Sequence, residues 1–429
     1  MIYDKELLSP ALKRRSVKRE LSLFREKSGA LLCRGLNFRE EDGAIVCGEG
    51  TEKISVLPEG TVKLIASKGH RMEAYAYTSA GSLISLNGGN SYSGVPSPKA
   101  VIAYTAESGE ELLFILTESA LYRLTGGSAV AVSGAKGGTD GCIFCERLLT
   151  ADGCSVRWSK PLSPVAWEDG LQEAGYVELP SSSGNILAVI PLKDCVYLFR
   201  ERGITALRMS GDTLAFKSEE TVVCGKIISG SIALCGEEVL FAAESGIYLF
   251  DGRLQKLDGC GFSEVGLLKE SAGGDKYYAS VVLKDGEDAL WVVDPTEKRG
   301  HFLRIRAETL TCTDELLYAE EGKLCRLIGH GMPAYGRREC VLKTEHSLLG
   351  LSARKKYLDS ISLEGTGRFC VEARAEKGAP RAAVGEAGER LVLPAPVRGT
   401  SFSLDIRTLS ERAKLKSITF DLREESETW

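Results

Sequence analysis

The pattern from which the fold is predicted is clearest in Cys235-Gly-Glu-Glu-Val-Leu-Phe-Ala-Ala-Glu-Ser-Gly-Ile-Tyr-Leu-Phe-Asp-Gly252. Two apolar runs, Val239–Ala243 and Ile247–Phe250, are rich in β-branched and aromatic residues, and only three residues separate them. Such spacing is typical of a β-hairpin. The second run stops at Asp251-Gly252, a pair that favours a turn. The stretch therefore predicts two short antiparallel strands between tight turns.

The same pattern of a turn, a strand with a large central residue and another turn recurs along the chain. The central residues are Tyr122, Trp158, Tyr197, Tyr248, Trp291 and Leu324. The steps between them are 36, 39, 51, 43 and 33 residues. Their average of about 40 residues is close to the length of a four-stranded propeller blade. With one earlier unit near Ser82–Leu86, the repeat predicts an all-β chain containing a β-propeller of six or seven blades.

Composition agrees with many short strands joined by turns. Glycine accounts for 47 of 429 residues, about 11% against a usual ~7%. The glycines lie between the short apolar runs. No apolar run approaches the ~20 residues of a membrane span, and no apolar signal core is present at the N-terminus. These features favour a soluble protein that is not exported through a cleaved signal.

Charge content and the spacing of apolar residues divide the chain into three regions. Residues 1–30 are expected to form a charged N-terminal arm, and residues 31–330 the propeller. After Gly329–Gly336, residues 331–429 alternate polar and apolar side chains with a period of two, which predicts an antiparallel β-sandwich. A strand from Ala30–Cys47 is expected to complete the blade built mainly from Leu317–Ile328, because circular closure removes free sheet edges.

Charge differs between these regions. Residues 1–30 carry eight Lys/Arg and four Asp/Glu, and residues 331–429 carry seventeen and fourteen. The region between them carries 29 Lys/Arg and 41 Asp/Glu, a balance of −12. An acidic body of this kind does not hold nucleic acid by neutralising phosphates.

Cysteine and histidine were considered as metal ligands. The chain has thirteen cysteines, an odd number spread along the apolar runs, which favours reduced, buried thiols. Cys142-Ile-Phe-Cys145 has metal-type spacing, but there is no second pair, and a strand would place its two thiols on opposite faces. The four histidines are scattered in sequence: His70, His301, His330 and His346. No metal site is predicted.

Catalytic and phosphate-binding motifs are missing from the sequence. There is no HExxH, no G-x-S-x-G, no Walker A loop and no G-x-G-x-x-G. The carboxylate pairs Glu237/Glu238 and Glu320/Glu321 offer glycosidase-type chemistry, but acidic pairs at turns are usually solvated. The sequence therefore predicts no catalytic residue and no cofactor.

In one further passage, Ala151–Trp167, a predicted strand ends at Trp158. Pro161 and Pro164 follow it, and then a second indole, Trp167. Proline donates no ladder bond, so the strand ends there, and the two indoles are expected to fold back on one another. This passage resembles one in the propeller-bearing tail proteins of bacteriophages, the nozzle and packaged-DNA stabilisation group of short-tailed phages.

Other segments share this resemblance. Leu31–Asn37 is similar to the N-terminal beginning of those proteins, and Gly246–Gly252 is similar to the sequence motif of their propeller blades. Arg398-Gly399 and the strand after it resemble their C-terminal sandwich. The resemblance implies a non-enzymatic virion structural protein, assembled in the host cytoplasm, that forms part of a sixfold or twelvefold ring around the DNA exit channel. DNA would pass without specific binding, and other tail or connector proteins would be the partners.

The charge layout fits a ring, because basic flanks and an acidic body place opposite charges across a head-to-tail contact. An alternative remains open. A propeller-type glycan-binding or glycan-hydrolysing protein would have its site at the mouth of the central channel. An intracellular protein-interaction propeller is a third interpretation.

Overall fold

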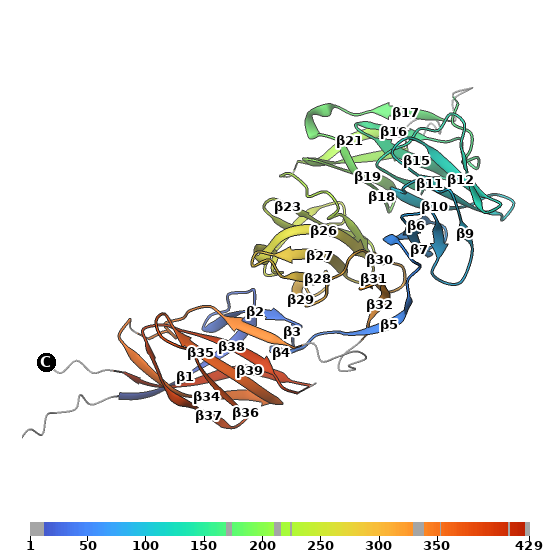
Figure 1. The fold of residues 1–429 in the computed structure, drawn as a ribbon. Helices are drawn as coiled ribbons and strands as arrows, with labels where there is room; N and C mark the ends of the chain where they lie inside the picture. The colour runs from blue at the N-terminus through green and yellow to red at the C-terminus, as the bar shows by residue number, and fades with distance from the viewer. Residues whose placement is uncertain are drawn as a thin grey trace, which may run out of the picture.

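The computed structural model describes residues 13–168, 174–209, 216–223, 225–328, 339–351, 353–410 and 412–424. In these residues the chain forms β-strands and two short 3-10 turns, η1 (Ser181–Ser183) and η2 (Phe262–Glu264). The strands build two bodies, a β-propeller and a β-sandwich (Figure 1). No helix in this part of the chain has the length and apolar character needed to cross a membrane. The all-β prediction is confirmed.

In the described residues the propeller has seven blades of four antiparallel strands each, within the predicted range. The first blade consists of β6 (Thr61–Gly69), β7 (Ala74–Thr78), β8 (Leu83–Ser85) and β9 (Ser91–Tyr92). The second consists of β10 (Ala100–Thr105), β11 (Glu111–Leu116), β12 (Leu121–Thr125) and β13 (Ser128–Ala131). The third consists of β14 (Asp140–Phe144), β15 (Arg147–Asp152), β16 (Ser155–Trp158) and β17 (Gly175–Glu178).

The next three blades follow in chain order. They are β18 (Ile186–Leu192), β19 (Cys195–Arg200), β20 (Gly203–Met209) and β21 (Phe216–Val223); β22 (Ala233–Cys235), β23 (Glu238–Ala243), β24 (Gly246–Phe250) and β25 (Leu254–Leu257); and β26 (Val265–Gly273), β27 (Tyr277–Leu283), β28 (Asp288–Asp294) and β29 (Arg299–Leu303).

The hairpin predicted from the opening stretch is formed by β23 and β24, which pair from Val239↔Phe250 to Ala243↔Gly246. Phe250 and Phe241 both pack edge-on against Phe199 of the preceding blade, with ring centroids 5.8 and 5.4 Å apart. The aromatic residues of the repeat therefore hold neighbouring blades together, as their buried positions require.

Five of the six repeat markers lie on the third strand of their blade, but Tyr197 does not. It lies on the second strand, β19, and pairs with Ala206 on the third strand, β20. The uneven steps of 39 and 51 residues therefore arise in part from a shift of one strand.

The segment Asn87–Pro98 contains the short outer strand β9 of the first blade. One local expectation needs correction. Trp158 and Trp167 do not fold back on one another. Trp158 packs edge-on against Phe216 with centroids 4.8 Å apart, whereas Trp167 belongs to a different apolar cluster and donates a hydrogen bond to the Pro164 carbonyl over 2.8 Å.

The propeller closes by combining distant parts of the chain, as predicted, but with a different strand. The seventh blade contains β30 (Leu310–Cys312), β31 (Leu316–Glu320), β32 (Lys323–Ile328) and, as its outer strand, β5 (Gly50–Val56). β5 pairs with β32 from Ile328↔Gly50 to Lys323↔Val56. The closing strand thus lies just beyond the predicted Ala30–Cys47.

The strands before β5 belong to the sandwich, which corrects the expected domain limits. Residues 13–23 form a long strand and not a charged arm, and residues 30–47 are outside the propeller. The sandwich strands are β1 (Lys13–Leu23), β2 (Ala30–Leu36), β3 (Phe38–Glu41), β4 (Ala44–Cys47), β33 (Val341–Thr344), β34 (Lys356–Thr366), β35 (Arg368–Ala375), β36 (Arg381–Glu386), β37 (Arg390–Gly399), β38 (Phe402–Thr408) and β39 (Lys414–Glu424).

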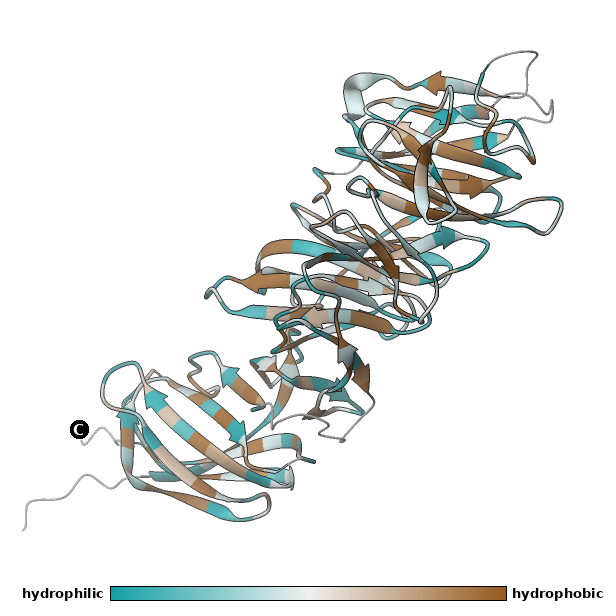
Figure 2. Cartoon of the chain, turned by 45° about the vertical axis from the view of Figure 1, so that its right-hand side comes forward, coloured by the Kyte–Doolittle hydropathy of each residue, from teal (hydrophilic) through white to brown (hydrophobic). Residues whose placement is uncertain are grey.

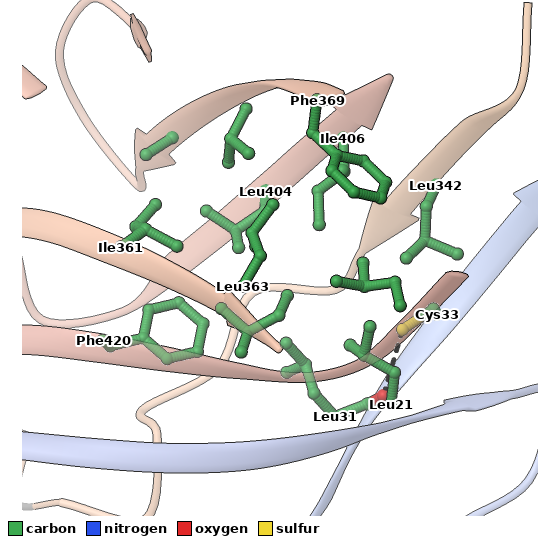
Figure 3. Packing of buried hydrophobic residues seen from close by; sticks show 14 of the residues in the cluster. Leu21, Leu31, Cys33, Leu342, Ile361, Leu363, Phe369, Leu404, Ile406 and Phe420 are labelled. Atoms are coloured by element: carbon green, nitrogen blue, oxygen red, sulfur yellow. Dashed lines mark hydrogen bonds between the residues drawn. The ribbon is translucent and has the colours of Figure 1, made fainter. Parts of the chain in front are cut away.

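The sandwich has two layers. One has the strand order β1-β39-β34-β37 and the other β2-β33-β38-β35-β36. β1 and β2 pair in parallel and join the two layers, so the sandwich is not purely antiparallel as predicted. Leucine, isoleucine and phenylalanine side chains from both layers meet in one buried core, including Leu21, Ile361 and Phe420 from the first and Leu342, Phe369 and Ile406 from the second (Figure 3). Along the strands hydrophilic and hydrophobic residues alternate (Figure 2), as expected when one face is buried.

The propeller is inserted between β4 and β33 of the sandwich, and Asn37 joins the two bodies. Its backbone N–H donates to the Phe302 carbonyl over 2.8 Å, and its Oδ1 accepts from the Arg304 N–H over 2.6 Å. Nδ2 donates to the Glu339 carbonyl and the backbone carbonyl accepts from Gly48 N–H. All four polar groups of this buried residue are therefore used at the junction.

Glu49, which follows Gly48 between β4 and β5, makes a second set of contacts at the junction. Its carboxylate lies 2.7 Å from His301 Nε2 and 3.2 Å from Lys276 Nζ. Burial alone would raise the pKa of Glu49, but the charge and hydrogen bond of His301 and the charge of Lys276 hold it well below its usual range.

We expect closure by β5 to be separable from the sandwich. A fragment spanning residues 49–328 retains β5 and should unfold cooperatively, whereas residues 58–328 leave the β32 edge unpaired. Loss of the closing strand should lower the melting temperature by roughly 10 °C, given ~2–4 °C per kcal/mol for domains of this size. Circular dichroism melts and gel filtration check this. Equal melting of the two fragments would contradict closure by β5.

We expect Glu49→Gln to reduce stability by roughly 3 kcal/mol at pH 7, because it breaks a buried ion pair. Since the folded-state pKa lies below the ordinary ~4.3, the contribution of Glu49 is present above that pH and is lost as the pH falls. Urea unfolding should therefore show a smaller difference between the variant and the wild type at pH 3 than at pH 7. Glu59→Gln at an exposed turn is the matched control.

Candidate functional site

A cavity of about 630 Å³ occupies the centre of the propeller. Its lining includes residues from the first strand of every blade: β6, β10, β14, β18, β22, β26 and β30. First strands are the innermost strands of a propeller, so the cavity is the central channel, the place where propellers offer a concave site.

The charged side chains of the channel come from four blades. Lys68 Nζ lies 2.6 Å from Asp140 Oδ1, and Asp140 Oδ2 accepts a hydrogen bond from the Val189 N–H over 2.8 Å. This carboxylate is thereby fixed between the first, third and fourth blades. Lys63 Nζ donates to the Pro98 carbonyl over 3.1 Å.

Glu270 faces this group from the sixth blade. Its Oε1 accepts a hydrogen bond of 3.4 Å from Thr309 Oγ1. Burial raises the pKa of Glu270 to about 7, while the Thr309 hydrogen bond and the Lys63 charge oppose that rise. Burial lowers the pKa of Lys63, Glu270 raises it, and Lys99 lowers it further. The channel therefore holds a carboxyl group that changes charge near neutral pH.

The described histidines lie in different places and have different hydrogen-bond partners. His70 lines the channel and accepts a hydrogen bond of 2.9 Å from the Thr105 N–H through Nδ1. His301 is committed to Glu49, and His346 lies 3.3 Å from Ser403 Oγ. His330 is outside the described residues. Among the residues that are described, no cluster of three or more His, Cys, Asp or Glu side chains is arranged to hold a metal ion.

The two cysteines with metal-type spacing are separated, but not by alternation along one strand, because Cys145 lies in the turn after β14. Cys142 is buried in the channel wall, where burial raises the pKa of its thiol, and Cys145 is exposed. Eight of the twelve described cysteines are buried. Cys47 and Cys340, at the two crossings between sandwich and propeller, share a thiol hydrogen bond that lowers the pKa of Cys47 to about 7.

The carboxylate pairs noted in the sequence lie outside the channel. Glu237 and Glu238 line a separate cavity of about 370 Å³ together with Asp251 and Asp275. Glu320 and Glu321 stand at the β31–β32 turn. The channel carboxylates, Asp140 and Glu270, were missed. Assigning the register of each blade first would have marked them as charged residues on innermost strands.

Comparison with known proteins gives only distant matches. No protein-family model matches the chain, and no curated protein matches it. Virginiamycin B lyase from Staphylococcus aureus is similar at 12% identity and a TM-score of 0.44, over 65% of this chain and 99% of the lyase. The Pan2 WD40 domain from Neurospora crassa is similar at 8% identity and a TM-score of 0.41, over 62% and 88%. Matches this weak carry no argument about activity.

We expect Glu270→Gln to stabilise the protein at pH 8. The pKa of Glu270 is higher in the folded chain than in the unfolded chain. The wild type therefore loses stability as the pH rises from the ordinary pKa of a glutamate toward 7, because Glu270 ionises less readily when folded. A rise of the pKa from its usual 4.5 to about 7 corresponds to about 3 kcal/mol. The variant and wild type should differ little at pH 4. Urea unfolding measures this, with exposed Glu107→Gln as the control.

Proposed function

We propose that the chain is a non-enzymatic structural protein of a bacteriophage tail, one subunit of a ring around the DNA exit channel. The observation that carries the proposal is the fixed attachment of the propeller to the sandwich at Asn37. Asn37 ends Leu31–Asn37, a segment that resembles the tail proteins. The overlapping strand β2 pairs with β29 of the propeller at Leu36↔Phe302.

A ring subunit needs a constant angle between its parts, since small errors accumulate around a closed assembly. Several contacts besides Asn37 oppose bending here. Phe24 packs edge-on against Phe302 with ring centroids 5.5 Å apart. Arg34 forms ion pairs with Asp285 at 2.9 Å and with Glu264 at 3.7 Å. Contacts from three parts of the sixth blade therefore fix the sandwich.

The charge argument for ring contacts becomes weaker in the folded chain. Lys18 forms an ion pair with Glu364 at 2.5 Å, and Arg15 with Glu424 at 3.5 Å. Arg19 donates to the Leu349 carbonyl. Three basic residues of the N-terminal segment thus have partners within the sandwich, and apolar contacts are expected to supply most of the affinity between subunits.

The test uses particles from the host strain whose genome encodes the chain. Electron microscopy and quantitative mass spectrometry should find six or twelve copies in a ring within the tail. Complementing a deletion with Asn37→Ala should reduce infectious particles at least ~tenfold, while Asn87→Ala, in an exposed turn, should not. Absence from the particle, or a single copy in it, would overturn the proposal.

The second candidate function, glycan binding by the propeller, is favoured by the size of the channel cavity. It requires a sugar that binds to the purified chain in the channel. Glycan-array binding by a chain that is absent from tailed particles would support this function over the first.

A further inference from the structure

The channel has the dimensions of a small-molecule site. Its volume of about 630 Å³ falls within the ~300–1,000 Å³ typical of ligand pockets. Backbone edges and side chains such as Ile65, Ile143 and Ile232 supply an apolar wall, and the charged groups provide a few polar anchors. This inference does not depend on the proposed role in a tail.

Charge in the channel is unbalanced. Three lysines, Lys63, Lys68 and Lys99, line it together with two carboxylates, Asp140 and Glu270. Lys68 is neutralised by Asp140 at 2.6 Å. Lys99 has a contact of 3.9 Å with Glu118, whose side chain is 90% exposed, so solvent screens that pair.

Lys63 and Lys99 therefore share one counter-charge inside the channel, Glu270. Both lysines line the channel, and Lys63 Nζ donates over 3.1 Å to the carbonyl of Pro98, the residue that directly precedes Lys99. Partly buried like charges are unfavourable unless an anion compensates them. A bound oxyanion would accept hydrogen bonds from both lysines and restore neutrality.

We propose that the propeller channel binds a small molecule bearing an oxyanion, a carboxylate, sulfate or phosphate group, held between Lys63 and Lys99, with its body against the apolar wall.

Glu270 makes this binding pH-dependent. The charged and titratable groups around it are Lys63, Lys68 and His70 from β6 and the turn after it, Lys99 before β10, Asp140 and Cys142 from β14, and Cys312 from β30. Above pH ~7 the ionised Glu270 competes with the ligand for the lysines, and below that pH it is neutral. Anion affinity is expected to fall as the pH rises through neutrality.

Isothermal titration calorimetry on the full chain tests the site with four probes: sulfate, glucuronate, glucose 6-phosphate and neutral glucose. The charged probes should bind at least ~10-fold more tightly than glucose, the range expected for hydrogen bonds to charged groups. Tighter binding of glucuronate or glucose 6-phosphate than of sulfate would assign the site to a sugar-borne anion. Equal binding of all three anions would assign it to the oxyanion alone.

Variants separate the channel from the rest of the surface. Lys63→Met and Lys99→Met should each weaken glucuronate binding about tenfold. Lys377→Met, an exposed lysine of the sandwich with the same change in net charge, should leave it unaltered. Glu270→Gln should act in the opposite direction, tightening binding several-fold at pH 8 and removing the pH dependence.

Two results would overturn the proposal. One is that none of the three anions binds more tightly than glucose. The other is that Lys377→Met weakens binding as much as the channel variants. If Lys63→Met fails to fold, as judged by circular dichroism, exposed Lys99 still provides the test.

Discussion

Asn37 is the residue through which the propeller and the sandwich constrain each other. Its backbone adopts a left-handed conformation with φ of 59°, which asparagine tolerates better than other non-glycine residues. That conformation turns the chain from β2 into β3 and aims the N–H and the side-chain oxygen at two backbone groups of the sixth blade. Gly48 approaches so closely that a Cβ there would lie 2.9 Å from Leu303 Cδ2. The junction therefore depends on two small, specific residues.

This junction explains why the first strand of the chain that belongs to the propeller is β5. Strands β1 to β4 are used in the sandwich, and only then does β5 supply the outer strand of the last blade. The propeller cannot close until the chain has returned to β32, because β5 pairs with residues 267 to 278 positions away. The segment between β4 and β5 is itself held to the propeller, because the partners of Glu49, His301 and Lys276, lie in the sixth blade.

The sequence predicted what depends on local pattern. Strand-turn alternation identified the blades, and the period of two identified β34, β35, β38 and β39. The same local signals failed for residues 13–23. Charged side chains alternate there with Val17, Leu21 and Leu23, and only the distant β39 decides that they form a strand. A closing strand was predicted but misplaced, since 30–47 and 50–56 carry equivalent patterns and differ only in their long-range partners.

The channel illustrates a further limit, because charge balance summed over the chain does not describe its interior. The region from 31 to 330 has an excess of twelve acidic residues, yet its channel is lined by three lysines and two carboxylates. Acidic side chains on turns are solvated and interact weakly, whereas Lys63 and Glu270 interact across a partly desolvated space where charges act more strongly. The field that a molecule entering the channel meets is therefore set by a few residues on the innermost strands. Two lysines facing one carboxyl group that titrates near neutral pH make that field positive on an otherwise acidic body, and more so as the pH falls.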